Sequence, residues 1–399
     1  MNSDFGRYIR SRRLEKSLSL SEASERMNLS LSYLERIENG DPSVSPSEKE
    51  MESIASVLEE ETWRLYNMAG RNGARSQNCV IECFPEITEQ FPESGRPVAS
   101  LFFPSFRIFV GWSCPSRCPF CFVPADSRGY LPFEELAGIV ERAAVWGRGR
   151  CFFTGGEPSL YPNLAKIIER GRKAGITSFG MATNGWGLVD SRPVQELNKL
   201  GLNVYHLSWF GQNTRRYSPG RPALEDVLES LHSVQGNRIV IYIVLFRDNR
   251  LECHEMIEEV VRLRKSFPDI SGVVFALVRP EGRAALRART VLFPYEEAVP
   301  SVRQAIELAD REKLPLMLNH FPACLLPDMP NATITSRIPV VLRNVNGEQV
   351  NSSALAGSCT PAGGELCIHM NSCIGYHEKY VELFGSGIFK PSGGLLRHS

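Results

Sequence analysis

Short apolar runs and longer amphipathic stretches alternate along the middle of the chain, between about residue 106 and residue 278. The apolar runs are bounded by turns or loops, as strands are, and they occupy residues 108–110, 151–153, 179–182, 204–207, 239–245 and 273–278. The stretches between them repeat apolar residues at helical spacing, at residues 133–145, 164–173, 193–200, 224–234 and 253–263. Strands separated by helices predict an α/β fold, with a parallel sheet, right-handed crossovers and about six βα units.

The first 70 residues carry a different pattern, that of several short helices. Phe5, Ile9 and Leu14 share one predicted helix, and residues 18–21 offer an N-cap for a second, shorter helix. A third helix runs over residues 31–38 until Asn39-Gly40 ends it. A later apolar stripe consists of Met51, Ile54, Ala55, Leu58 and Leu65. We therefore expect an all-α domain over residues 1–70.

Composition changes again on either side of the α/β region. Residues 71–103 begin with a polar stretch and continue with several prolines, which predicts a linker. Near the end of the chain, Gly, Pro and Asn become frequent and the strand–helix pattern stops. We place the α/β core at residues 104–322 and a small cysteine-containing extension at residues 323–399.

Charge gives the whole chain no preference for a polyanion, because its 399 residues contain 45 Lys and Arg and 45 Asp and Glu. No apolar run approaches the roughly 18 residues of a membrane span, and the first residues show no signal-peptide pattern. We expect a cytoplasmic protein with no membrane partner. Its 11 cysteines would then be metal ligands or buried thiols, since a reducing compartment disfavours disulfides.

Three of these cysteines, Cys114, Cys118 and Cys121, lie within eight residues of one another. An odd number of thiols at such short spacing indicates a metal site. Thiolates are the soft ligands of iron–sulfur clusters, and one short loop can bind three irons of a [4Fe-4S] cluster and leave the fourth open. A zinc ion with a fourth ligand from elsewhere in the chain is the alternative.

Two further motifs follow the next two predicted strands. Residues 154–158 read Thr-Gly-Gly-Glu-Pro, and residues 183–185 read Thr-Asn-Gly. Together with the CxxxCxΦC run before them, in which Φ is aromatic, these motifs resemble those of the radical S-adenosylmethionine (SAM) superfamily, in the same order. The resemblance implies a partial, TIM-like (β/α) barrel whose active site lies at the carboxyl ends of the strands, where all three motifs fall.

The resemblance also implies the chemistry. Cys114, Cys118 and Cys121 would ligate a [4Fe-4S] cluster, and the amino and carboxylate groups of SAM would chelate its open iron. One electron, supplied by a donor such as flavodoxin or ferredoxin, would cleave SAM into methionine and a 5′-deoxyadenosyl radical, which abstracts a substrate hydrogen. The catalytic residues that act on the substrate are not indicated.

Other residues match positions that contact SAM in this superfamily. Gly155, Gly156 and Glu157 match the motif that binds the SAM amino group: glycines let the backbone approach, and a carboxylate meets the ammonium. Phe120, beside the last cysteine, matches the position that packs near the adenine. The remaining residues predicted to bind the cofactor are Asn184 and Ser208.

Residues 1–70 resemble a helix-turn-helix domain of the Cro/C1 type, notably in residues 20–40, LSEASERMNLSLSYLERIENG. In that family the helix starting near Ser30 enters the major groove. The predicted DNA contacts are Ser30, Ser32, Tyr33 and Arg36. Residues 1–70, however, contain nine Lys and Arg against 13 Asp and Glu, a net charge of −4. DNA binding would need a focused basic patch from Arg7, Arg10, Arg12 and Arg13. Otherwise the domain docks a protein partner or dimerises.

Four cysteines in the last quarter of the chain, Cys324, Cys359, Cys367 and Cys373, are candidate ligands of an auxiliary metal site. The segment resembles the SPASM or twitch extensions of radical SAM enzymes, which hold auxiliary [4Fe-4S] clusters. It departs from their pattern at Gly364, where relatives usually have a cysteine, so Cys359 would have to substitute. Four thiolates could hold one second [4Fe-4S] cluster, and structural zinc is the alternative.

These features predict a radical SAM enzyme that modifies a peptide or protein, because SPASM-like tails are common in peptide maturases and a helical domain could hold a leader segment. A small-molecule or nucleotide substrate is the alternative within enzymes. A DNA-binding regulator that uses the iron–sulfur domain as a SAM or redox sensor is the alternative outside them. The intact set of three motifs argues against a sensor, which does not need a complete radical-generating site.

Overall fold

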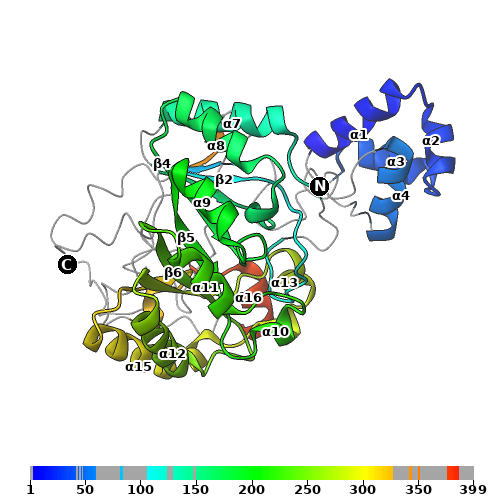
Figure 1. The fold of residues 1–399 in the computed structure, drawn as a ribbon. Helices are drawn as coiled ribbons and strands as arrows, with labels where there is room; N and C mark the ends of the chain where they lie inside the picture. Colours follow the sequence, from blue (N-terminus) through cyan, green and yellow to red (C-terminus); the bar gives the residue numbers. More distant parts are fainter. Residues whose placement is uncertain are drawn as a thin grey trace, which may run out of the picture. The chain divides into compact units, whose positions relative to one another are not determined.

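The computed structural model describes residues 3–41, 44, 46, 48–59, 81–83, 106–123, 129–146, 150–326, 341–343, 349–350 and 375–385. The chain divides into two compact units, one of which holds residues 1–79 while the other begins at Val80. Figure 1 draws the helices of the first unit in blue and the strand–helix repeat of the second from cyan to yellow. No helix in these described ranges is both long and apolar enough to cross a membrane.

The first unit is built from short helices around its own apolar core, as the sequence predicts. Its helices are α1 Ser3–Glu15, α2 Leu20–Arg26, α3 Leu31–Glu38 and α4 Glu48–Leu58. Helix α2 begins with a capping box, in which Glu22 N donates to Ser19 Oγ and Ser19 N donates to Glu22 Oε2. The expected stripe on α4 is buried at Met51, Ile54, Ala55 and Leu58, whereas Leu65 lies outside the described residues.

A buried ion pair fastens α1 to the end of α3. Arg13 Nε lies 2.6 Å from Glu38 Oε1, and its NH2 group donates to Glu38 Oε2 at 2.9 Å. Arg13 is 7% exposed and also donates to the Leu18 carbonyl. The expectation that Arg13 contributes to a surface basic patch is therefore wrong, because its charge is neutralised inside the unit.

The second unit contains seven parallel strands, one more than the apolar runs predict. Their order in the sheet follows the sequence: β2 Phe106–Phe109, β3 Arg150–Thr154, β4 Ser178–Thr183, β5 Leu202–Ser208, β6 Arg238–Leu245, β7 Ile270–Leu277 and β8 Leu316–Asn319. They form a half-barrel, so the α/β class and the partial TIM-like fold are confirmed. The additional strand is β8, which has only four residues and follows a proline.

Helices connect successive parallel strands and account for the predicted amphipathic stretches. The longer ones are α7 Phe133–Trp146, α8 Leu164–Lys173, α9 Ser191–Lys199, α11 Leu224–His232, α12 Cys253–Ser266 and α15 Val299–Arg311. Shorter elements are α10 Thr214–Tyr217, α13 Gly282–Leu286, α14 Ala288–Val291 and the 3₁₀ helices Pro158–Leu160, Tyr295–Ala298 and Ala323–Leu325. Basic residues end α8 and α12, where they complement the helix dipole.

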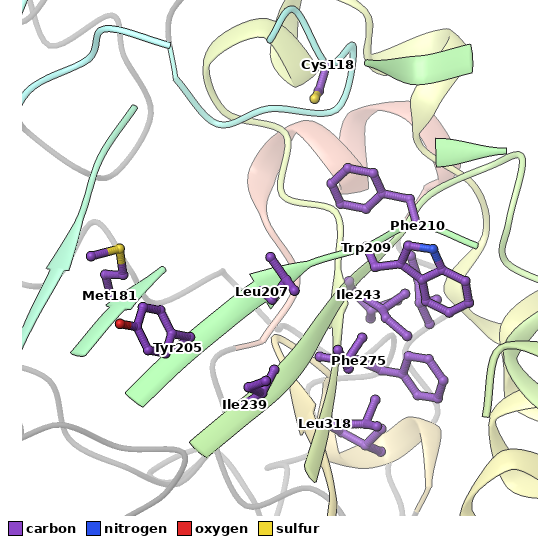
Figure 2. Packing of buried hydrophobic residues seen from close by; sticks show 14 of the residues in the cluster. Cys118, Met181, Tyr205, Leu207, Trp209, Phe210, Ile239, Ile243, Phe275 and Leu318 are labelled. Atoms are coloured by element: carbon purple, nitrogen blue, oxygen red, sulfur yellow. The ribbon is translucent and has the colours of Figure 1, made fainter. Parts of the chain in front are cut away.

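Alternate residues of the strands pack against these helices in one continuous core. Figure 2 shows Met181, Tyr205, Leu207, Ile239, Ile243, Phe275 and Leu318 on successive strands, with Cys118 on a loop above them in this view. The core continues beyond the carboxyl ends of the strands through Trp209 and Phe210. The segment that follows β5 is therefore part of the buried core.

Three short antiparallel strands extend the sheet at β2. They are β1 Ile81–Cys83, which pairs with β2, and then β9 Val341–Arg343 and β10 Gln349–Val350. Strand β1 lies inside the range expected to be a linker, and β9 and β10 lie inside the expected C-terminal extension. The remaining residues of that linker, 71–80 and 84–103, are outside the described part of the chain, so the domain boundaries stay predictions.

One helix of the C-terminal extension, α16 Glu378–Phe384, packs on the core. The Tyr380 ring stacks on the Tyr295 ring with centroids 4.1 Å apart, and Tyr295 N donates to Tyr380 Oη at 2.8 Å. Tyr295 Oη in turn donates to the Val278 carbonyl, just after β7. The described part of the tail is thus anchored beside the carboxyl end of β7.

Candidate active site

The three sequence motifs meet at the carboxyl ends of neighbouring parallel strands. The cysteine loop follows β2, the Gly155-Gly156-Glu157 segment follows β3, and Asn184 follows β4. Ser208 is the last residue of β5. Because β2 to β5 are adjacent and parallel in the sheet, these residues share one edge of it, where the active sites of such sheets lie.

The paired glycines allow the cysteine loop to dock on the end of β3. Gly156 N donates to the Gly111 carbonyl and Glu157 N donates to the Ser113 carbonyl, both at 2.8 Å. A Cβ at Gly155 would lie 2.3 Å from Gly111 O, and one at Gly156 would lie 2.2 Å from Ser113 O. Gly155 also has a φ of +129°, which disfavours any side chain. The close approach that requires these glycines here is therefore that of the cysteine loop itself.

Glu157 is buried at 1% exposure and links the ends of β3 and β4. Its Oε1 accepts hydrogen bonds from Ser159 N, Ser159 Oγ and Thr183 Oγ1, and its Oε2 accepts one from Asn184 N at 2.7 Å. Burial raises the pKa of Glu157, and these donors oppose that shift. The carboxylate thus fixes the Thr-Asn-Gly turn, while its contact with the SAM amino group stays a prediction.

Asn184 connects that turn to the cysteine loop. Its Nδ2 lies 3.4 Å from Cys114 Sγ and 3.4 Å from Ser116 Oγ. Ser116 is itself 3% exposed and is bonded to the indole N–H of Trp186 and to the hydroxyl of Ser218. Ser116, Trp186 and Ser218 were not among the residues expected from the sequence, because no motif marks them.

Two of the three cysteine sulfurs accept a hydrogen bond. Asn184 Nδ2 donates to Cys114 and Val123 N donates to Cys121 at 3.4 Å each, whereas the Ser218 hydroxyl donates to Ser116 Oγ. Burial raises the pKa of Cys114 to about 11 and raises that of Cys118, and each of these thiols interacts electrostatically with Cys121. Such thiols are protonated until a metal replaces the proton.

Two buried guanidinium groups lie near Cys118, and both oppose the rise in its pKa. Arg221 is 5% exposed; its Nε donates to the Asn184 carbonyl at 3.0 Å and its NH2 to the Ser208 carbonyl. Arg283 is 9% exposed and its Nε donates to the Cys118 carbonyl at 3.3 Å. Positive charge held in a dry site beside three thiols favours a negatively charged group there.

The donor set fits the group that the motifs imply. Three soft sulfur ligands, two of which accept a hydrogen bond, and two buried cations suit a thiolate-bound iron–sulfur cluster. Among the described residues, no three His, Cys, Asp or Glu side chains form a preformed site for a single metal ion, so it is the chemistry of these donors, and not their arrangement, that fits the cluster. The cluster ligation by Cys114, Cys118 and Cys121 accordingly remains our proposal.

The other predicted SAM contacts lie at the same edge of the sheet. Phe120 is 5% exposed, stacks on Phe246 with centroids 4.2 Å apart and meets the edge of Phe210 at 4.6 Å. Ser208 and Asn184 line a cavity of about 290 Å³ together with Arg215, Arg221 and Glu225. Phe120 and the three cysteines are not among the residues that line this cavity, so the contact of these residues with SAM stays a prediction.

Two other sets of candidate residues are less complete. Cys324 is half-buried, with its Sγ 3.5 Å from Tyr376 Oη. Cys359, Cys367 and Cys373 lie outside the described residues, so the auxiliary site stays a prediction.

The predicted DNA contacts on α3 are engaged within the first unit. Ser30 caps α3, its Oγ accepting from Tyr33 N and lying 3.4 Å from Ser32 Oγ. Arg36 pairs with Asp41 at 2.8 Å. The one cation of the predicted recognition helix thus has an acidic partner.

Comparison with known families separates the two units in the same way as the structure. Residues 109–261 match the radical SAM superfamily, and residues 4–60 match a helix-turn-helix domain. The chain carries a helix-turn-helix domain followed in the sequence by a radical SAM domain. Both resemblances drawn from the sequence motifs are therefore confirmed.

Relatives of the radical SAM domain are enzymes with different substrates. The GTP 3′,8-cyclase of Tolumonas auensis is 30% identical over 169 residues, which is 40% of this chain and 49% of that enzyme. The PqqA peptide cyclase of Rhizobium meliloti is 26% identical over 228 residues, 55% of this chain and 59% of that enzyme. The chain thus spans about half the length of these curated relatives.

Among solved structures, Streptococcus suis SuiB bound to its precursor peptide SuiA aligns with 56% of this chain and 50% of its own. The TM-score is 0.45 and the identity is 17%.

Proposed function

We propose that this protein is a radical SAM enzyme that binds a [4Fe-4S] cluster through Cys114, Cys118 and Cys121 and cleaves SAM reductively. The observation that carries the proposal is the arrangement of the cysteine loop. Two of its three sulfurs accept a hydrogen bond, two buried arginines lie near the third, and its backbone is fixed to the Gly-Gly-Glu segment by two 2.8 Å hydrogen bonds. When bound, the cluster supplies one electron for cleavage of SAM.

The protein's own residues would position these groups and exclude water. The Asn184 side chain orients Cys114. Its backbone N–H donates to Glu157, and its carbonyl accepts from Arg221. Oε2 of Glu157 accepts one hydrogen bond among the described residues, so a lone pair remains for the SAM ammonium. Phe120 and its aromatic neighbours close the apolar side of the site.

For the substrate, we propose a peptide or protein. Two features support it: the SPASM-like cysteine pattern of the tail, and the peptide cyclase relative, which aligns with 55% of this chain. The helical first unit could hold a leader segment of such a substrate. The GTP cyclase relative favours a nucleotide as the second candidate.

A regulatory role for the helix-turn-helix domain is the proposal of a different class. The family match over residues 4–60 supports it, and the pairing of Arg36 with Asp41 weakens it. A neighbouring reading frame for a short Cys-, Ser- or Thr-rich peptide would favour the maturase, whereas an operator-like inverted repeat upstream would favour the regulator.

The experiment that tests the proposed function is anaerobic reconstitution with iron and sulfide, followed by dithionite and SAM. We expect a [4Fe-4S] spectrum and formation of 5′-deoxyadenosine, which increases when the correct candidate peptide or nucleotide is added. A reconstituted protein that binds no cluster, or that leaves SAM intact in the presence of dithionite, contradicts the proposal.

A further inference from the structure

The segment after β7 forms a second support for the cysteine loop, separate from the Gly-Gly-Glu segment. Helix α13 begins at Gly282, and the backbone N–H groups of Arg283 and Ala284 donate to the carbonyls of Val123 and Cys121, at 3.1 Å each. The side chain of Arg283 adds a third bond, from Nε to the Cys118 carbonyl. One short segment therefore binds the backbone carbonyls of Cys118, Cys121 and Val123.

Gly282 permits this contact. Its φ is +52°, and a Cβ there would lie 2.0 Å from the Phe122 carbonyl oxygen. No side chain fits between α13 and the loop at this point. The separation between Arg283 and the cysteine loop is thus set by backbone contact and not by a flexible side chain alone.

Arg283 carries a buried charge without a local counter-ion. It is 9% exposed, and within the described residues it forms no salt bridge with a carboxylate. The nearest acidic residue in sequence, Glu281, pairs with Arg279 instead. A buried cation normally needs an opposite charge beside it, since leaving water is costly for an isolated charge.

The cysteine loop is the available source of that negative charge. Arg283 Nε donates to the Cys118 carbonyl at 3.3 Å in a buried contact, which places its guanidinium group beside this predicted ligand. With three thiolate ligands, a [4Fe-4S] cluster carries a net negative charge, which increases by one on reduction. A cation at this position therefore favours the reduced cluster more than the oxidised one.

We propose that Arg283, on α13, is the counter-ion of the cluster and raises its reduction potential. This inference rests on the proposed function, because it needs the cluster at the three cysteines. Arg221 is the second buried cation near Cys118, but it also bonds the carbonyls of Asn184 and Ser208. Its substitution would disturb the strand ends, so Arg283 offers the cleaner test.

The test is a potentiometric titration of the reconstituted full-length protein without SAM, followed by the EPR signal of the reduced cluster. In Arg283→Gln we expect the equilibrium constant for one-electron reduction to fall about tenfold, which is about 59 mV toward more negative potential. Arg283→Lys keeps the charge and should stay closer to the wild type. Arg289→Gln is the matched control, because Arg289 is exposed on α14, and it should leave the potential unchanged.

Each outcome bears on the inference. An unshifted potential in a fully loaded Arg283→Gln protein overturns it, while a cluster spectrum from the wild type shows that the cluster-binding part of the proposed function stands. A wild type that takes up no cluster overturns both. If the Gln variant takes up too little iron, Arg283→Met serves as a second neutral variant. Failure of both neutral variants with full loading of Arg283→Lys supports a need for charge, whereas failure of all three shows that Arg283 is a structural anchor only.

Discussion

Substitution of Glu157 by Gln tests whether this carboxylate holds the active-site loops together. A glutamine can keep its carbonyl oxygen at the Oε1 position, where Ser159 N, Ser159 Oγ and Thr183 Oγ1 donate. Its amide nitrogen then faces Asn184 N, a donor 2.7 Å from the present Oε2. Two donors cannot bond, so the Asn184 N–H loses its partner. In the opposite orientation, the amide nitrogen faces Ser159 N, which then loses its partner, while the two hydroxyls can turn to accept.

The expected cost is that of one hydrogen bond to a charged group, about 1.5–3 kcal/mol. Burial raises the pKa of Glu157 and thus disfavours its charge, so a neutral amide recovers part of this loss. We expect the free energy of unfolding of the second unit to decrease by about 2 kcal/mol. This loss lies in the lower half of the range because removing a buried charge recovers part of the free energy.

The assay is urea denaturation of the metal-free protein, read from the transition of the second unit at unchanged slope. Glu169→Gln is the matched control, because Glu169 is exposed on α8 and should change stability by no more than about 0.5 kcal/mol. If Glu157→Gln unfolds with the same midpoint as Glu169→Gln, the carboxylate does not hold the two strand ends together and the reasoning fails.

Three further predictions concern the two units and the tail. Arg13→Ala should destabilise the first unit by about 3 kcal/mol, because it leaves Glu38 buried without its partner. Arg10→Ala is the control, because Arg10 is exposed, and equal melting temperatures of the two variants would contradict this prediction. The full-length protein should bind duplex DNA weakly at about 0.15 M salt, since Arg36 is paired with Asp41; nanomolar affinity with a steep salt dependence, measured by fluorescence anisotropy, would show otherwise. The anaerobic protein should contain about eight irons, and a variant with alanine at all three loop cysteines should keep about four; an iron-free or zinc-containing variant would exclude the auxiliary cluster.

The strands and helices that position the site could be predicted from the sequence because their signals are local. The helical spacing at residues 164–173 coincides with α8, and the Thr-Gly-Gly-Glu-Pro and Thr-Asn-Gly segments follow β3 and β4 as expected. Strand β8 was missed because four residues after a proline carry little periodicity. Glycine at 155 and 156 indicated a close approach, but the sequence could not show that the approaching group is the carbonyl of the cysteine loop.

The residues around the cysteines could not be predicted because they come from distant parts of the chain. Ser218 is 102 residues from Ser116, and Arg283 is 165 residues from Cys118. Serine and arginine are common surface residues, and only their burial beside the cysteine loop distinguishes Ser218 and Arg283 from the others. Conversely, the sequence offers Arg13 as part of a basic surface patch, whereas its pairing with Glu38 depends on how α1 and α3 pack.

The central claim is that the cysteine loop binds the cluster that cleaves SAM, and Cys118→Ala tests it most directly. Cys118 lies beside both buried arginines. Cys151 is a fully buried thiol on β3 outside the loop and supplies the control. Both variants are reconstituted anaerobically and given dithionite and SAM, and 5′-deoxyadenosine is quantified. We expect none above background from Cys118→Ala and near wild-type amounts from Cys151→Ala. Continued formation of 5′-deoxyadenosine by Cys118→Ala would contradict the claim.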